Sequence, residues 1–112
     1  MIGNHCIITI SNIPNPEPLK YINTLKPLLE KIIIDCNLHV VNQAGHQFEP
    51  FGVTYVYVLS ESHLSIHTYP EKASAYMDIF CCSDTFSPAA ALQSITEIFG
   101  RKSKINFRCI ER

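Results

Sequence analysis

The most constraining feature of the sequence is a polar stretch, residues 59–71, that lies between two runs of apolar, strand-like residues. The run Val53–Leu59 is rich in valine and tyrosine, which predicts a buried strand. The stretch that follows carries hydroxyl groups, two imidazoles and two carboxylates. Polar groups in the middle of a small core must be hydrogen-bonded or used in function. We therefore expect residues 59–71 to contain the functional site.

Length and charge exclude several classes of protein. A chain of 112 residues is long enough for one domain, residues 1–112, that buries about two thirds of its unfolded surface. A net charge of -1 gives no electrostatic reason to bind nucleic acid or acidic membranes. Residues 1–10 lack the basic flank of a signal peptide, and no apolar run approaches the ~18 residues of a membrane span. We expect a cytoplasmic protein without nucleic-acid or membrane partners.

The cysteines and histidines indicate neither a disulfide framework nor a metal site. The chain has five cysteines, an odd number, without a Cys-x-x-Cys pair, which favours reduced thiols in the cytoplasm. His63 and His67 are four residues apart, a spacing that chelates a metal on a helix. On a strand, the same spacing separates the two side chains by about 13 Å. We therefore expect no metal.

Periodicity and turn residues divide the chain into strands and helices. A helix capped by Thr24 is predicted to run to Cys36, with Pro27 tolerated in its first turn, and a second is predicted from Ser87-Pro88 to Phe99, ending at Gly100. A short helical segment is predicted over 17–22, and 43–52 is predicted to be a loop. Strands are predicted over 5–10, 38–42, 53–60, 63–68, 73–82 and, at a sheet edge, 104–110.

This order of elements predicts the α+β class. Four consecutive strands favour a mostly antiparallel sheet, with two helices on one face in a two-layer sandwich. The other sheet face then stays uncovered. Because the strand over 53–60 is apolar on both faces, we expect the uncovered face to pack on a second copy of the chain.

The polar stretch also resembles a known family. The run Glu61–Glu71 (ESHLSIHTYPE), followed by Asp78–Cys82 (DIFCC), is similar to the processing and catalytic region of the prokaryotic S-adenosylmethionine decarboxylase proenzymes. These are self-processing, pyruvoyl-dependent enzymes of polyamine biosynthesis. The resemblance is strongest over residues 46–82. It implies a homodimer in which two sandwiches form a four-layer αββα structure.

The resemblance implies that the chain cleaves itself between Glu61 and Ser62. The products are a β chain, residues 1–61, and an α chain, residues 62–112. Ser62 becomes a pyruvoyl group, the only cofactor, which forms a Schiff base with the substrate. The resemblance assigns His67 as the base of the processing reaction. Thr54 stands where the family usually has a serine whose hydroxyl assists.

The resemblance also assigns the proton donor of the decarboxylation to Cys82, which follows His67 by 15 residues. The adjacent Cys81 does not fit this spacing. By strand parity, the two cysteine side chains point to opposite faces of the sheet.

The substrate implied by the resemblance is S-adenosylmethionine, whose decarboxylated product donates the aminopropyl group of spermidine. Phe48 resembles the aromatic residue that stacks on the adenine, and Glu71 the carboxylate that binds the ribose hydroxyls. Tyr69 offers a further aromatic face to the sulfonium cation, and Phe51 or Tyr55 can assist. We expect these residues to bind substrate across the dimer interface.

The sequence departs from the family pattern at several positions. Tyr69 stands where many relatives have tryptophan, and Tyr55 replaces a usual glycine. These departures leave a pyruvoyl-dependent ornithine or arginine decarboxylase as an alternative, with Glu49 or Glu71 facing the distal cation. A regulatory homologue that never cleaves is the third alternative.

Overall fold

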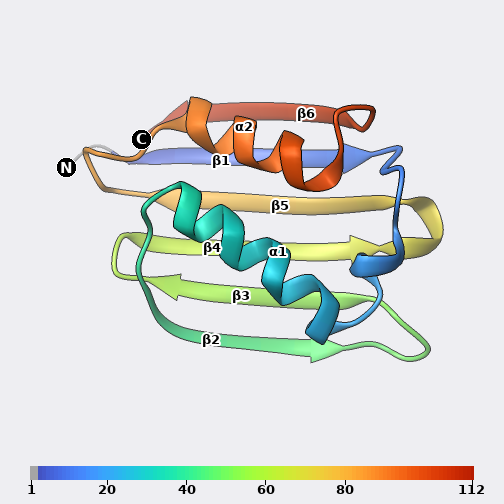
Figure 1. Cartoon of the computed structure of the whole chain (residues 1–112). Coiled ribbons are helices and arrows are strands. Elements are labelled where there is room, and N and C mark those ends of the chain that lie inside the picture. The colour runs from blue at the N-terminus through green and yellow to red at the C-terminus, as the bar shows by residue number, and fades with distance from the viewer. Residues whose placement is uncertain (1–2) are drawn as a thin grey trace.

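The computed structural model describes residues 3–112; Met1 and Ile2, which begin the N-terminal run considered above, lie outside the described residues. Within the described range, one antiparallel sheet of six strands has the order β2-β3-β4-β5-β1-β6 (Figure 1). The strands are β1 (Asn4–Ser11), β2 (Val40–Gln47), β3 (Val53–Leu59), β4 (Ser62–Tyr69), β5 (Ser74–Cys81) and β6 (Lys104–Glu111). The helices are α1 (Ile22–Asp35) and α2 (Pro88–Phe99), with short 3-10 turns η1 (Glu17–Leu19) and η2 (Pro70–Lys72).

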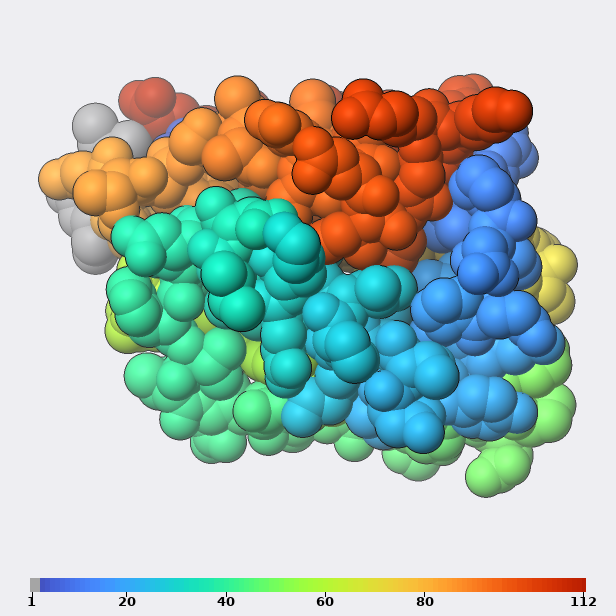
Figure 2. All heavy atoms as spheres, in the orientation of Figure 1, coloured from blue at the N-terminus to red at the C-terminus, as the bar shows by residue number. Residues whose placement is uncertain are grey.

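Helices α1 and α2 lie on the same face of the sheet, which confirms the predicted two-layer α+β sandwich (Figure 1). Alternate residues of each inner strand point toward the helices, and fully buried examples are Ile8, Leu64 and Ile79. They pack against the apolar sides of the helices, which include Leu29 and Ile95. Figure 2 shows that the two helices and the segment before α1 cover this face. The hydrophobic core therefore lies between the sheet and the helices.

The opposite face of the sheet is not covered by any element of residues 3–112, and we call it the open face. Its apolar side chains include Ile7, Val58 and Tyr76, which are 43%, 45% and 45% exposed. Between them lie imidazoles, hydroxyls and a carboxylate. The predicted packing of this face on a second copy remains a prediction. No helix of the described residues is long and apolar enough to cross a membrane.

Strand β2 differs from its prediction. Residues 43–47 were predicted to be part of a loop, whereas β2 continues through them to Gln47 and pairs with β3. Strand β2 lies at the edge of the sheet and its side chains are exposed, so it does not need alternating apolar residues. The polar residues 43–47 therefore resemble a loop in the sequence although they form a strand. Its glycine has a packing reason, because a Cβ atom at Gly45 would collide with the ring of Tyr55 on β3.

Helix α1 begins two residues before the predicted cap Thr24. The N–H of Ile22 donates to Oε1 of Gln47 at 2.8 Å, so a side chain from β2 caps the helix. This partner lies 25 residues along the chain, and no local sequence signal reveals it. The earlier start places Pro27 in the second helical turn instead of the first.

Helix α2 and strand β6 agree with their predictions. The hydroxyl of Ser87 accepts a hydrogen bond from the N–H of Ala90 at 3.2 Å, and Gly100 ends the helix with φ = 107°. Strand β6 lies at the edge of the sheet, next to β1.

Candidate active site

The turn between β3 and β4 is a two-residue connection with an unusual backbone conformation directly after it. Leu59 pairs with Ser62 across the turn, and Ser62 has φ = 146°. Residues other than glycine rarely adopt a positive φ, because the side chain then crowds the backbone. A residue held in this conformation costs about 1–3 kcal/mol of strain. The chain is therefore strained next to the bond between Glu61 and Ser62, where the sequence predicts cleavage.

A hydrogen-bond donor points at the carbonyl group of this same bond. The backbone N–H of Cys82, just beyond β5, donates to the carbonyl oxygen of Glu61 at 2.9 Å. The hydroxyl of Ser62 and the thiol of Cys82 are 3.5 Å apart. An N–H in this position polarises the carbonyl and stabilises negative charge that develops on its oxygen. Glu61, Ser62 and Cys82 thus form one group, the turn group, at one end of the sheet.

The side chain of Glu61 is held by a residue that the sequence did not indicate. Its carboxylate accepts a hydrogen bond from the backbone N–H of His39 at 3.2 Å and lies 2.7 Å from Nδ1 of the same residue. Burial alone raises the pKa of Glu61, but these hydrogen bonds outweigh burial, so the pKa is lowered. His39 precedes β2 and lies 22 residues from Glu61. The contact anchors the turn that presents the predicted cleavage bond.

A second group of predicted residues lies around a cleft at the ends of β3 and β4 that are opposite the turn. Thr54 on β3 and His67 on β4 are directly paired, and a hydrogen bond of 2.9 Å joins Oγ1 of Thr54 to Nδ1 of His67. Both residues line a cleft of about 270 Å³. The same cleft is lined by Phe48, Tyr69 and Glu71, the three predicted substrate-binding residues. We call these five residues the cleft group.

The turn group and the cleft group are separated within one chain. Ser62 and His67 lie five residues apart on strand β4, a distance of about 16 Å at about 3.3 Å per residue. Neither Ser62 nor Cys82 lines the cleft. A histidine must lie within hydrogen-bond reach of the proton that it removes. His67 therefore does not reach Ser62 of its own chain.

Comparison with known proteins gives the family. Residues 4–112 match the family model described as S-adenosylmethionine decarboxylase. The chain belongs to this family. An S-adenosylmethionine decarboxylase proenzyme of Thermodesulfovibrio yellowstonii is 40% identical over 98 residues, which cover 88% of this chain and 72% of the relative. A proenzyme of the same name from Prochlorococcus marinus is 34% identical over 103 residues, 92% of this chain and 82% of the relative.

A solved structure supports the same assignment. The crystal structure of the adenosylmethionine decarboxylase from Aquifex aeolicus matches 99% of this chain and 90% of its own, with a TM-score of 0.86 and 28% sequence identity. The fold of the decarboxylase family thus extends over the described chain.

The adjacent cysteines of this family member have different environments. Cys81 is fully buried toward the helices, and burial raises the pKa of its thiol. Cys82 is half-buried and contacts Ser62. The predicted opposite orientation is thus observed.

Tyr55 and Phe51, the two further aromatic residues expected to assist substrate binding, also have different environments. Tyr55 is buried on the helix side, its hydroxyl donates to Oε1 of Gln43 at 2.7 Å, and it does not line the cleft, so that expectation is wrong. Tyrosine at this position packs over the glycine of β2 instead. Phe51 does line the cleft, with Nζ of Lys20 5.1 Å from its ring centre.

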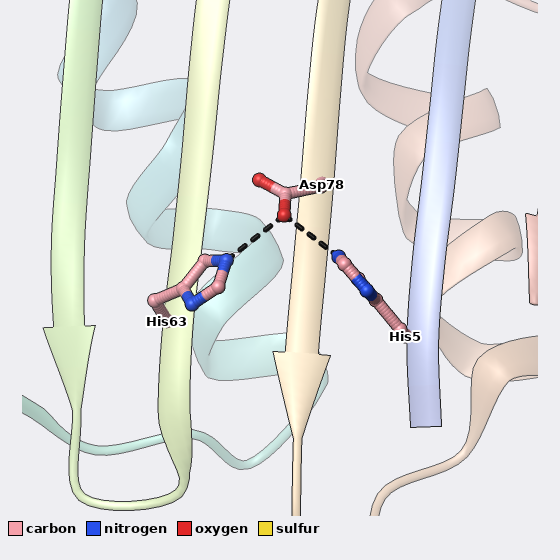
Figure 3. A group of neighbouring side chains, drawn as sticks. All are labelled: His5, His63 and Asp78. Atoms are coloured by element: carbon pink, nitrogen blue, oxygen red, sulfur yellow. Dashed lines mark hydrogen bonds and ion pairs between the residues drawn. The ribbon is translucent and has the colours of Figure 1, made fainter. Parts of the chain in front are cut away.

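Among residues 3–112, one group of side chains has the spacing of a metal site. It is not the pair His63 and His67 considered from the sequence. His5, His63 and Asp78 come from β1, β4 and β5 and meet on the open face (Figure 3). Each histidine places Nε2 2.9 Å from Oδ2 of Asp78, and the hydroxyl of Ser65 donates to Oδ1. Burial raises the pKa of Asp78, but these hydrogen bonds together lower it. The group is internally hydrogen-bonded around one carboxylate.

Proposed function

We propose that the chain is the proenzyme of a pyruvoyl-dependent S-adenosylmethionine decarboxylase that acts in the cytoplasm in polyamine synthesis. The observation that carries the proposal is the N–H of Cys82 on the carbonyl of Glu61, beside a serine with positive φ. The family and the relatives named as decarboxylase proenzymes support it.

The proposed cleavage proceeds in two stages. The hydroxyl of Ser62 attacks the carbonyl carbon of Glu61, the peptide C–N bond breaks, and an ester joins the two residues. The N–H of Cys82 stabilises the negative charge on the oxygen in this step. A base then removes the α-proton of Ser62, the bond between Cβ of Ser62 and the ester oxygen breaks, and the main-chain carboxylate of Glu61 leaves. Rearrangement and hydrolysis of the resulting enamine release ammonia and leave a pyruvoyl group at residue 62.

The base in this proposal comes from a second copy of the chain. His67 is about 16 Å from Ser62 along its own strand, too far for proton transfer. If two open faces pack about a two-fold axis, the cleft group of each copy can meet the turn group of the other. The partner's His67, held by the partner's Thr54, then acts on Ser62. Two equivalent sites result, and each is incomplete without the other copy.

The pyruvoyl group supplies a ketone that condenses with the substrate's amino group and draws electrons from the bond to its carboxylate. The residues of the turn group complete the reaction. The thiol of Cys82 contacts the side chain of Ser62 at 3.5 Å and is therefore the proposed proton donor to the substrate carbon. Cys81 is buried on the other face and has no access.

The cleft group favours S-adenosylmethionine over a basic amino acid as the substrate. Phe48 and Tyr69 are each 47% exposed at the cleft, so their faces are available to a stacked adenine and a sulfonium cation. Glu71 lies at the rim on η2, where its carboxylate can accept hydrogen bonds from two ribose hydroxyls. An arginine or ornithine substrate has neither an adenine to stack on an aromatic ring nor ribose hydroxyls to donate to Glu71, so it would leave these contacts unused.

Two measurements on one preparation test the proposal. The intact mass of the purified protein should show chains 1–61 and 62–112, whereas Ser62→Ala should give a single chain. Carbon dioxide release should be measured from S-adenosylmethionine, arginine and ornithine at equal concentrations, and only the first should react. A wild-type chain that stays whole after long incubation and hydroxylamine treatment contradicts cleavage and favours the regulatory homologue. Turnover of arginine or ornithine alone contradicts the substrate.

A further inference from the structure

Two cysteines far apart in sequence lie side by side on β1 and β6. Cys6 and Cys109 are directly paired in the antiparallel register, so their side chains point to the same side of the sheet. The thiol of Cys6 donates to Sγ of Cys109, and the two sulfur atoms are 3.2 Å apart. Among residues 3–112, no other two thiols are in hydrogen-bonding contact.

The strand geometry suits a covalent bond between these two sulfur atoms. Residues directly opposite in an antiparallel ladder have Cα atoms about 4.5–5.5 Å apart, which lies within the range of about 4.4–6.8 Å found for disulfides. A disulfide bond is about 2.05 Å long, so the sulfur atoms of Cys6 and Cys109 need to approach by only about 1 Å. We expect rotation about the two Cα–Cβ bonds to close this gap, because it moves the sulfur atoms without moving the strands.

The two thiols differ in access to solvent. Cys6 is fully buried, whereas Cys109 is exposed on the edge strand β6. A soluble oxidant therefore reaches Cys109 first, and Cys6 is the thiol placed to resolve the product. A solvent-accessible thiol next to a second, resolving thiol is an arrangement often found at sites of reversible oxidation.

We propose that Cys6 and Cys109 are a site of reversible disulfide formation that covalently joins the two chains made by self-cleavage. The proposed cut separates residues 1–61, which contain Cys6, from residues 62–112, which contain Cys109. Strand β1 of the first chain then lies between β5 and β6 of the second, held by hydrogen bonds and packing alone. The pairing of the thiols is independent of the cut, but the rejoining of two chains rests on the proposed function.

The oxidant is a low-molecular-weight disulfide such as oxidised glutathione. The thiolate of Cys109 attacks one sulfur of glutathione disulfide and releases one molecule of glutathione. The thiolate of Cys6 then attacks Sγ of Cys109 and releases the second. Two protein thiols thus lose two electrons and two protons, and one glutathione disulfide becomes two thiols. Burial raises the pKa of the Cys6 thiol, so the second step should accelerate as the pH rises.

The test uses the processed wild-type protein, incubated with oxidised glutathione at mildly alkaline pH, alkylated and run on a denaturing gel without reductant. The two chains should migrate as one species, and dithiothreitol should separate them. Trypsin without reductant should yield residues 1–20 linked to residues 109–112. Cys109→Ser should leave the chains separate, whereas the matched control Cys36→Ala, which alters another buried cysteine, should still give the linked species.

Two outcomes overturn the inference: wild-type chains that remain separate after oxidation, or a linked species that persists in Cys109→Ser. If the protein does not cleave itself, the proposed function fails, but the disulfide is still read from the linked peptides. The whole chain would then be lighter by the two hydrogen atoms lost. The two failures are therefore distinguishable.

Discussion

The backbone N–H of Cys82 lies 2.9 Å from the carbonyl oxygen of Glu61 and donates a hydrogen bond to it. The donor belongs to the main chain, whereas the thiol of the same residue points at the hydroxyl of Ser62. One residue therefore presents two separate chemical groups to the turn. The N–H is proposed to serve cleavage and the thiol to serve decarboxylation, and substitution can separate the two.

Cys82→Ala should still cleave because alanine keeps the backbone N–H, but it should decarboxylate slowly. Loss of a positioned proton donor typically costs about 10²–10⁴-fold in rate. Intact mass reports the cleavage, and carbon dioxide release from S-adenosylmethionine reports the turnover.

Cys81→Ala is the matched control, because this thiol is buried on the other face of the sheet. It should retain turnover, with a modest loss of stability. Normal turnover in Cys82→Ala together with lost turnover in Cys81→Ala would transfer the donor role to Cys81 and contradict the assignment.

The hydrogen bond between Thr54 and His67 predicts a graded effect on cleavage. Thr54→Ser keeps the hydroxyl and should cleave at a rate close to that of the wild type. Thr54→Val keeps the shape without the hydroxyl, so the imidazole loses its partner and cleavage should slow by about 10-fold or more, equivalent to about 1.4 kcal/mol. The time course of intact mass measures both rates.

His67→Ala should stop at the ester stage, because the α-proton of Ser62 then has no base. Hydroxylamine attacks esters far faster than peptide bonds, so it should cut this variant between Glu61 and Ser62. A His67→Ala protein that cleaves at the wild-type rate would remove the base from the proposal.

The lowered pKa of Asp78 predicts that the free energy of unfolding depends on pH in the acidic range. Its pKa is lower in the folded chain than in the unfolded chain, so its ionised form stabilises the fold above the unfolded pKa of about 3.9. This contribution is lost as the pH falls through the lower, folded pKa. At pH 7, Asp78→Asn should cost about 1–3 kcal/mol, because hydrogen bonds to a charged group are replaced by weaker ones.

Urea unfolding between pH 7 and pH 3 measures this effect. The stability difference between wild type and Asp78→Asn should narrow as the pH falls. Asp84→Asn, which alters an exposed carboxylate, is the control and should run parallel to the wild type. A constant difference for Asp78→Asn across the range would mean that the carboxylate's charge plays no part.

Local signals were sufficient for some elements of the fold and not for others. Helix α2 was predictable because its cap Ser87 and its stop Gly100 are adjacent in sequence to the residues they terminate. Helix α1 was misplaced because its cap is the side chain of Gln47, on a strand formed later in the chain. Strand β2 was predicted too short because exposed edge residues carry little apolar pattern.

The candidate site shows the same division. The linear motif indicated Ser62, His67 and Cys82, because their order and spacing can be read along the chain. It did not reveal that His39 holds the carboxylate of Glu61, a contact across 22 residues without a local pattern. Nor did spacing alone show that the motif divides into two groups about 16 Å apart on one strand, since that follows from β4 remaining extended from Ser62 to His67.

This separation gives the most direct test of the central claim, that a pyruvoyl decarboxylase site is assembled from two copies of the chain. Ser62→Ala and His67→Ala should each be inactive alone. When the two variants are expressed together with different affinity tags, the mixed dimers should contain one complete site, formed by Ser62 of one copy and the partner's His67. We predict that doubly purified mixed dimers show cleaved His67→Ala chains and decarboxylate S-adenosylmethionine at about half the wild-type rate. Mixed dimers that form but neither cleave nor decarboxylate would contradict the account.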